Sequence, residues 1–366
     1  MRDKMKKWLA AWCGLTAACA LTTSCSMMQE DMDHCPIGLY LSFKYDYNLQ
    51  RADMFNDHVG AVTVYVFDEQ GRYVTRQEEA NTAAAAPLTS SMYTMHMNLA
   101  PGRYKFLVLA GQKDYEAQLA GPGANFVRTV PTVGDPMEGT LQVTLDHVVG
   151  ADGFVVDNEG QPLDTLWHGM ELRDIEVSAT RPTYDTISLV RDTKNIRVSL
   201  REIDDPTQMS VEEYDFRIID RNTHILWDNS LDETDQVTYT PYTTWDTFDR
   251  TPATDVNGDP LDEPGVIAHA EFMTSRILAH DDAADDGILS VTNRETGVEV
   301  IRVNLPDMLC QLRKFADIYR YSEQEFLDRG YDYQLDFFLR GGELNYVNIS
   351  ISVLNWSVRW QPAELQ

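Results

Sequence analysis

The chain has 366 residues, of which 43% are hydrophobic and 24% are charged, a composition typical of a folded protein with a sizeable core. Its 30 lysines and arginines stand against 58 aspartates and glutamates, which gives a net charge of −28. This excess of negative charge largely excludes nucleic acid as a partner, because phosphate contacts need a basic face, and it argues against docking on an anionic membrane through protein charge.

The first 24 residues are typical of an export signal. The basic run MRDKMKK precedes an apolar run at residues 8–21, which is too short to span a membrane. The apolar run ends in LTTSC, where small residues precede Cys25 and polar residues follow it. This arrangement resembles a bacterial lipobox. We therefore predict that residues 1–24 are a lipoprotein signal peptide and that Cys25 carries the lipid.

The residues around Cys25 leave alternatives open. Thr22 stands where a lipobox usually has an apolar residue, so a plain signal peptide with an incidental cysteine is one alternative, and Cys19 is a weaker candidate for the lipid. Residues 25–35 include Glu30, Asp31 and Asp33, and this acidic run resembles the surface-export signal of Bacteroidetes lipoproteins. We interpret residues 25–35 as a lipidated acidic tether, and a merely solvated tether is the alternative.

The five cysteines divide into two groups. Cys13 and Cys19 leave with the signal peptide and Cys25 takes the lipid, so that Cys35 and Cys310 remain in the mature chain. An exported chain can form disulfides. Cys35 and Cys310 can therefore pair, or both can be buried free thiols, and the sequence does not decide between these two states.

Alternating apolar and polar residues predict strands along the chain. Val62, Val64 and Val66 share one face of the first, and a turn at 68–71 leads into a second strand that begins RYV. Further alternation predicts strands at 104–108, 141–145, 196–200, 214–218 and 347–353. Short strands divided by Gly, Pro, Asn and Asp favour an all-β fold built as an antiparallel sandwich.

The alternation changes phase near the C-terminus. After the strand at 347–353, the apolar positions of WSVRW are displaced by one residue, which predicts a β-bulge at Leu354–Asn355 within one continuous strand. Two stretches rich in small and polar residues, 83–91 and 249–265, are predicted to be long exposed loops.

Helix is predicted mostly within 306–330. Pro306 is placed as a first-turn proline, and the apolar residues that follow it up to Tyr319 share one helical face. The residues from Ser322 to Glu325 form a capping box for a second short helix, which is expected to end at Gly330.

Few residues suggest chemistry. Two acidic segments, 255–263 and 280–287, loosely resemble calcium loops, but their spacing does not fit an EF-hand and we interpret them as acidic surface loops. Trp167-His168-Gly169 has no associated base or nucleophile and is interpreted as a packed tryptophan at a domain junction. The histidines show no metal-binding spacing. We predict no catalytic residue, no metal, no cofactor and no enzymatic activity.

A set of segments in fixed order resembles the fimbrillin-associated anchor family of Bacteroidetes. The resemblance extends from about Cys25 to Trp360 and rests on CPIGLYLSFKYDYN, VGAVTVYVFDEQGRYV, LAPGRYKFLVLAG, LWHGM, RDTKNIRVSL, YTPY, SEQEFLDRGYDYQLDFFL and NWSVRW. It implies two tandem transthyretin-like antiparallel β-sandwich domains with short helices. It also implies an outer-membrane lipoprotein that anchors type V fimbriae and limits their length.

From this resemblance we expect a sandwich domain at 36–183 and a second at 184–366. The expected partners are fimbrial pilin subunits, docked by strand addition to an open sheet edge, and the outer membrane through the N-terminal lipid. No nucleic acid or small-molecule substrate is expected. The chain stops six residues after Trp360, so we expect it to accept a strand or to terminate the fibre rather than to donate a strand.

Two other functions compete with anchoring. One is a surface glycan-binding lipoprotein of a polysaccharide uptake system, for which an exposed aromatic pair over a groove is the distinguishing feature. The other is a lipoprotein enzyme, for which a cleft with strongly perturbed carboxylates is the distinguishing feature.

Overall fold

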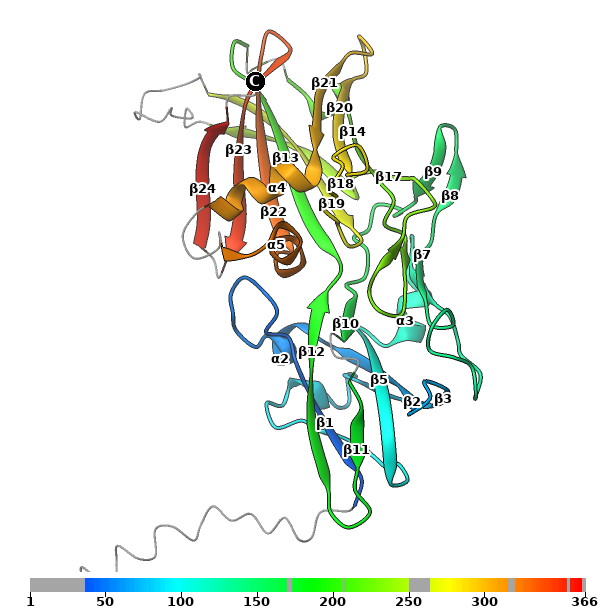
Figure 1. The fold of residues 1–366 in the computed structure, drawn as a ribbon. Coiled ribbons are helices and arrows are strands. Elements are labelled where there is room, and N and C mark those ends of the chain that lie inside the picture. The colour runs from blue at the N-terminus through cyan, green and yellow to red at the C-terminus, as the bar shows by residue number, and fades with distance from the viewer. Residues whose placement is uncertain are drawn as a thin grey trace, which may run out of the picture.

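Four β-sheets form the framework of the structure, as the alternating sequence predicts. The chain is described by a computed structural model, which covers residues 37–169, 173–205, 207, 209–249, 264–314, 320–353 and 356–363 (Figure 1). Helices are few and short within these ranges. The prediction of an all-β fold is confirmed.

The first sheet has eight strands in the order β3-β2-β5-β10-β12-β1-β4, and β11 also pairs with β5. Its strands are β1 (Leu39–Lys44), β2 (Ala61–Asp68), β3 (Tyr73–Ala80), β4 (Met95–Met97), β5 (Gly102–Gly111), β10 (Trp167–Gly169), β11 (Ile175–Val177) and β12 (Thr183–Arg191). β1 runs parallel to β12, whereas the other pairs in this sheet are antiparallel.

Both faces of β2 are buried. Val62, Val64 and Val66 point into one hydrophobic cluster, whereas Tyr65 and Phe67 point into another on the opposite face. The first cluster is closed by two short elements, the helix α2 (Phe55–His58) and the 3-10 turn η2 (Pro87–Thr89). The sheet therefore takes part in two cores at once, and the predicted strand, turn and returning strand at 62–74 are confirmed.

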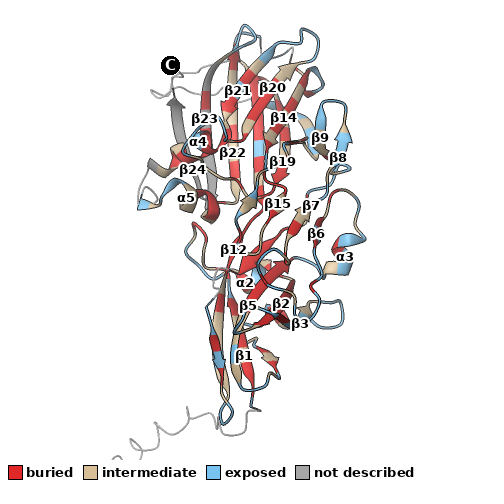
Figure 2. Ribbon diagram, turned by 45° about the vertical axis from the view of Figure 1, so that its right-hand side comes forward, coloured by how far each residue is buried: buried red, intermediate tan, exposed pale blue. Residues whose placement is uncertain are grey.

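Two six-stranded sheets enclose the larger core. Their orders are β18-β19-β13-β22-β23-β24 and β21-β20-β14-β17-β9-β8. The first contains β13 (Lys194–Glu202), β18 (Thr243–Asp249), β19 (Gly265–Thr274), β22 (Asp332–Arg340), β23 (Glu343–Val353) and β24 (Trp356–Ala363), and the second contains β8 (Val148–Gly150), β9 (Gly153–Val156), β14 (Tyr214–Asp220), β17 (Val237–Tyr239), β20 (Ile288–Asn293) and β21 (Glu299–Asn304). Side chains of both sheets, such as Val198 and Ile218, belong to one hydrophobic cluster. Figure 2 shows the buried stretches along the strands of these sheets in red.

The eight-stranded sheet forms the lower half of the molecule in Figure 1 and the two six-stranded sheets form the upper half. A small four-stranded sheet joins these two halves. Its order is β16-β15-β7-β6, formed by β6 (Phe126–Arg128), β7 (Val143–Leu145), β15 (His224–Ile225) and β16 (Leu231–Asp232). The halves are also connected in two other ways. The chain leaves the eight-stranded sheet at the end of β12 and enters β13 after only two residues, 192 and 193. In addition, β8 and β9 belong to a six-stranded sheet whose other strands come from beyond residue 200.

The short helices lie close to where the sequence places them. α4 (Leu305–Cys310) continues as the 3-10 turn η4 (Gln311–Lys314), and residues 315–319 of the predicted helix lie outside the described residues. α5 (Glu323–Arg329) begins at the predicted cap, where Ser322 Oγ accepts from Glu325 N at 3.1 Å, and it ends at Gly330. Two further elements, α3 (Tyr115–Leu119) and η3 (Val211–Glu213), complete the described helices.

The predicted β-bulge near the C-terminus is wrong. β23 and β24 pair antiparallel with Val353 opposite Trp356, so the two segments form neighbouring strands of opposite direction and not one continuous strand. Residues 354–355 themselves lie outside the described part of the chain. A register shift does occur in this hairpin, but between Val347 and Ile349.

The two predicted loops have different outcomes. Residues 83–91 are a connection with mostly exposed side chains, as expected, except that η2 turns Leu88 fully into the core. Of the second loop, 249–265, residues 250–263 lie outside the described ranges, as does the acidic segment 255–263.

Candidate functional site

The cysteines predicted to carry lipid or a disulfide fall mostly outside the described residues. Cys25 and Cys35 belong to the undescribed residues 1–36. Cys310, at the end of α4, is buried, and its Sγ lies 3.7 Å from Glu323 O. Burial raises the pKa of its thiol to about 12. Lipidation of Cys25 and pairing of Cys35 with Cys310 both stay predictions.

Trp167 and His168 occupy the centre of the junction between the two halves. Trp167 in β10 is fully buried and meets Tyr45 edge to face, with ring centroids 5.9 Å apart. His168 Nδ1 lies 2.8 Å from Gly169 O and its Nε2 lies 3.0 Å from Trp227 O. Desolvation lowers the pKa of His168 to about 4, so the ring is neutral at physiological pH. The interpretation of Trp167 as a packed tryptophan is confirmed, whereas its place at a domain junction stays a prediction.

A buried group of charges surrounds the crossing from β12 to β13. Arg276 donates two hydrogen bonds to the Asp328 carboxylate, from Nε at 2.9 Å and from Nη2 at 2.8 Å. Lys194 is fully buried and donates from Nζ to the carbonyl oxygens of Arg191, Asp328 and Gly330 at 2.8–3.2 Å. Burial raises the pKa of Asp192 and lowers that of Lys194, because each charged form loses its hydration.

Aromatic rings and arginines fasten the loop after β1 to the upper half of the molecule. The Arg329 guanidinium lies 3.9 Å from the Tyr47 ring centroid and 4.7 Å from that of Tyr321. Arg51 Nε donates to Tyr321 Oη at 2.7 Å, and Gln50 Nε2 donates to the Tyr331 hydroxyl at 3.3 Å. Cation–π contacts and hydrogen bonds therefore join residues at least 270 positions apart in the sequence and stabilise this contact.

Two carboxylates with raised pKa values are buried among protein groups. Burial raises the pKa values of Asp192 and Asp220, and these carboxylates accept hydrogen bonds from Asn229 and Asn222, respectively. A cavity of about 390 Å³ lies elsewhere, between η3, β14 and the start of β18. Its lining residues are Val211, Glu212, Tyr214, Asp215, Phe216, Thr240, Pro241, Thr244 and Arg294.

The second acidic segment is partly structural. Asp286 is nearly buried, and its Oδ1 contacts His280 Nδ1 at 2.9 Å, while His280 Nε2 contacts Glu233 Oε1 at 2.7 Å. The two carboxylates outweigh desolvation and raise the pKa of His280. Residues 281–285 are exposed. The interpretation of 280–287 as an acidic surface loop is therefore confirmed for 281–285, whereas Asp286 fixes one end of the loop.

Paired aromatic rings on the surface stack against one another. Tyr40 and Tyr184 face each other across β1 and β12 with centroids 5.1 Å apart, and Tyr40 also stacks on His96 of β4 at 4.6 Å. Trp245 stacks on His269 between β18 and β19 at 4.9 Å. These rings use their faces for cross-strand packing, which stabilises the sheets.

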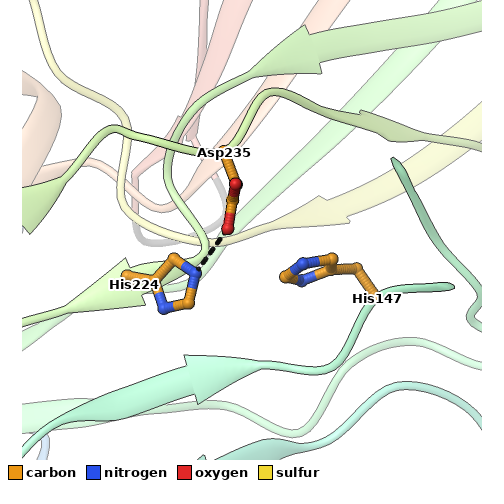
Figure 3. A group of neighbouring side chains, drawn as sticks. All are labelled: His147, His224 and Asp235. Carbon is orange, nitrogen blue, oxygen red and sulfur yellow. Dashed lines mark hydrogen bonds and ion pairs between the residues drawn. The ribbon is translucent and has the colours of Figure 1, made fainter. Parts of the chain in front are cut away.

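Three residues missed by the sequence analysis gather beside the four-stranded sheet (Figure 3). His147, His224 and Asp235 each offer one ligand atom, and these atoms lie within 4.8 Å of one another. His224 Nε2 and Asp235 Oδ2 are 3.1 Å apart, and the two imidazole rings are nearly perpendicular with centroids 5.9 Å apart. No short motif could have revealed the group, because its members come from three separate segments.

Helices of the described residues are all too short or too polar to cross a membrane. The family model described as fimbrillin-A associated anchor proteins Mfa1 and Mfa2 matches residues 32–362. Among proteins with curated descriptions, none matches the chain.

Solved structures of Bacteroidales proteins share the fold. A candidate adhesin from Bacteroides thetaiotaomicron is 27% identical with a TM-score of 0.70, and the match covers 89% of this chain and 98% of that one. A candidate polysaccharide-binding protein from the same species is also 27% identical, with a TM-score of 0.67 and coverage of 89% and 99%. The fimbrial anchor protein Mfa2 from Porphyromonas gingivalis is 16% identical, with a TM-score of 0.57 and coverage of 89% and 99%.

Proposed function

Because the chain belongs to the family of fimbrillin-A associated anchor proteins, we propose that it holds the base of a type V fimbrium at the cell surface and limits the length of the fibre. The observation that carries this proposal is the family match over residues 32–362, which spans nearly the whole chain after the predicted export signal. The all-β architecture supports it, since sheets with open edges can pair with further strands.

Attachment to the outer membrane is proposed to occur through lipid on Cys25. The support is the LTTSC sequence at the end of the apolar run, followed by the acidic tether at 25–35. A single acyl chain binds membranes only marginally, so the several chains of a bacterial lipoprotein are needed for stable anchoring. In Cys25→Ala we expect loss of fatty-acid labelling and release of the protein from the outer-membrane fraction. Labelling that persists in this variant would refute the assignment.

The body is proposed to consist of two transthyretin-like domains, at 36–183 and 184–366. The support is the presence of two large hydrophobic clusters. One lies on one face of the first sheet, under α2 and η2, and the other lies between the two six-stranded sheets and reaches the opposite face of the first sheet. The proposed boundary falls at the start of β12, whose residues Thr183–Ser188 pair with β1 and whose residues Leu189–Arg191 pair with β10.

We propose that the incoming pilin strand adds to β24. This strand has eight residues and stands at the end of its sheet, and among the described residues only β23 pairs with it. The edges at β3 and β18 are protected. β3 carries the charged residues Arg76, Glu78 and Glu79, and Asp246 of the edge strand β18 accepts hydrogen bonds from Ser210 and Val211 beside it. Charges on an edge and covering segments both oppose strand addition.

Cross-linking in the native host tests the docking edge. A photoreactive residue placed at 357 or 358 in β24 should form a covalent adduct with a pilin, whereas the same residue at 75 in β3 serves as the matched control. Because the chain has a net charge of −28, attraction to an equally acidic pilin cannot drive docking, and salt should strengthen the association or leave it unchanged. If adducts form from position 75 in β3 and not from position 357 or 358 in β24, the pilin docks at β3 and the proposal for β24 is wrong.

Deletion of the gene in its native host tests the anchoring role itself. We expect fimbriae to be shed into the medium and to grow longer than normal, as seen by fractionation and electron microscopy. Complementation with the wild-type chain should restore attached fibres of normal length, while Cys25→Ala should not. Normal, attached fimbriae in the deletion strain would rule out the anchoring role.

A further inference from the structure

We propose that His147, His224 and Asp235 form a binding site for one divalent transition-metal ion, with zinc as the best fit. The site is independent of the anchoring role. One nitrogen from each histidine and one carboxylate oxygen lie within 4.8 Å of one another. Zinc bonds to these atoms are about 2.0–2.2 Å long, so the three donors can surround a single ion after inward shifts of less than ~1 Å.

The sheet holds the three donors in place. His224 lies in β15, opposite Thr144 of β7 and opposite Asp232 of β16. His147 follows the end of β7 by two residues, and Asp235 precedes the start of β17 by two. Each donor is therefore within two residues of a paired strand, which gives a preformed site instead of a chance meeting of mobile side chains.

Hydrogen bonds orient both imidazoles for binding through Nε2. His147 Nδ1 lies 3.0 Å from Leu145 O, and because a carbonyl only accepts, Nδ1 carries the proton and Nε2 of the neutral ring has the free lone pair. His224 Nδ1 lies 3.2 Å from Thr144 Oγ1, a hydroxyl that can accept a hydrogen bond from Nδ1–H when Nε2 binds a metal. Metal-binding histidines usually donate their other ring N–H to such an acceptor.

The donor set selects the type of ion. Two imidazoles and one carboxylate suit zinc and its neighbours, whereas calcium and magnesium prefer oxygen ligands throughout. The His224 and Asp235 side chains are 26% and 35% exposed, so an ion can enter from solvent and can keep a fourth position for water or for a ligand from a partner. The Phe154 ring packs edge-on against His147 at 4.9 Å and shields the inner side.

A bound ion would connect two sheets. His224 belongs to the four-stranded sheet, while His147 and Asp235 lead directly into β8 and β17 of a six-stranded sheet. The ion would thus join the linking sheet to the upper half of the molecule, and zinc should raise the thermal midpoint of unfolding.

Metal binding by the full-length protein, purified from its native host and stripped with a chelator, tests the site. We expect one zinc ion per chain by equilibrium dialysis with elemental analysis, and no retention of calcium or magnesium. Cobalt should give the visible absorption bands of a four-coordinate ion. His147→Gln and Asp235→Asn preserve side-chain size, and each should weaken zinc binding at least tenfold and abolish the zinc-dependent rise of the thermal midpoint.

His280→Ala is the matched control, because His280 also contacts two carboxylates, Glu233 and Asp286, but lies outside the site. This variant should bind zinc as the wild type does. The proposal is overturned if the wild-type chain binds no stoichiometric zinc, or if His147→Gln and Asp235→Asn bind it as tightly as wild type. In either case His224 and Asp235 are simply a hydrogen-bonded pair.

Discussion

Removal of the Asp328 carboxylate should strongly destabilise the protein. In the folded chain both carboxylate oxygens accept from Arg276, at 2.8 and 2.9 Å, and the two side chains are only 10% and 15% exposed. Asp328→Ala leaves the guanidinium buried without its counter-charge. Breaking a buried ion pair by removing one partner typically costs ~3–5 kcal/mol.

The expected cost lies at the lower end of that range. Arg276 keeps its hydrogen bond to Asn229 O, and its partial exposure lets water solvate part of the charge. We therefore expect the free energy of unfolding to fall by about 3 kcal/mol, measured as a shift of the urea midpoint by far-UV circular dichroism. Glu78→Ala is the control, because the Arg76–Glu78 pair is 37% and 43% exposed and such pairs contribute at most about 1 kcal/mol.

A double variant separates the pair from the charge left behind. In Arg276→Met with Asp328→Leu both charges are replaced by apolar groups, so the destabilisation should be smaller than in Asp328→Ala alone. If Asp328→Ala costs no more than Glu78→Ala, or if the double variant is the less stable of the two, the unpaired-charge argument is incorrect.

Three further predictions concern single residues and are checked by urea unfolding. Trp167→Ala should cost ~3–5 kcal/mol, because a fully buried ring leaves a cavity; a loss below 1 kcal/mol would contradict its role in packing. Ser322→Ala should cost about 1 kcal/mol through loss of the α5 cap, while Ser322→Thr should cost less. Burial raises the pKa of Asp220 from 3.8 to about 7. The folded chain therefore keeps a proton that the unfolded chain releases, so this group's contribution to stability falls as pH rises from about 4 to about 7, by up to roughly 4 kcal/mol. Asp220→Asn should flatten this pH dependence, and an unchanged slope would refute the assignment.

Regular strands were predictable because their side chains alternate between core and solvent. The segment 62–67 shows the limit of this signal, since both faces of β2 are buried, and yet valine and aromatic residues still identify a strand. The turn after Val353 was not predictable. A shift of phase by one residue fits a bulge and a tight turn equally well, and Leu354–Asn355 contains neither glycine nor proline.

Two features of the structure, the group of His147, His224 and Asp235 and the buried Lys194, could not be predicted from the sequence, for two different physical reasons. His147, His224 and Asp235 meet only because β7 pairs with β15, a contact that no local pattern specifies. Lys194 was hidden because lysine is almost never fully buried unless paired. It is buried here because the chain passes between two sheets at that point, where three carbonyl oxygens replace its hydration.

The proposed anchoring role gives the buried junction a mechanical meaning. An anchor is pulled between its membrane end and its fimbrial end. β1 and β12 are parallel and in register from Leu39 opposite Thr183 to Lys44 opposite Ser188, and β12 continues into β13 towards the upper half (Figure 1). Tension applied before β1 and beyond β13 therefore pulls the two strands in opposite directions along their axes, so their hydrogen bonds share the load and do not open one by one. The two-residue crossing between β12 and β13 lies on that path, and there Lys194 and its carbonyl partners tie the crossing to the C-terminal end of α5.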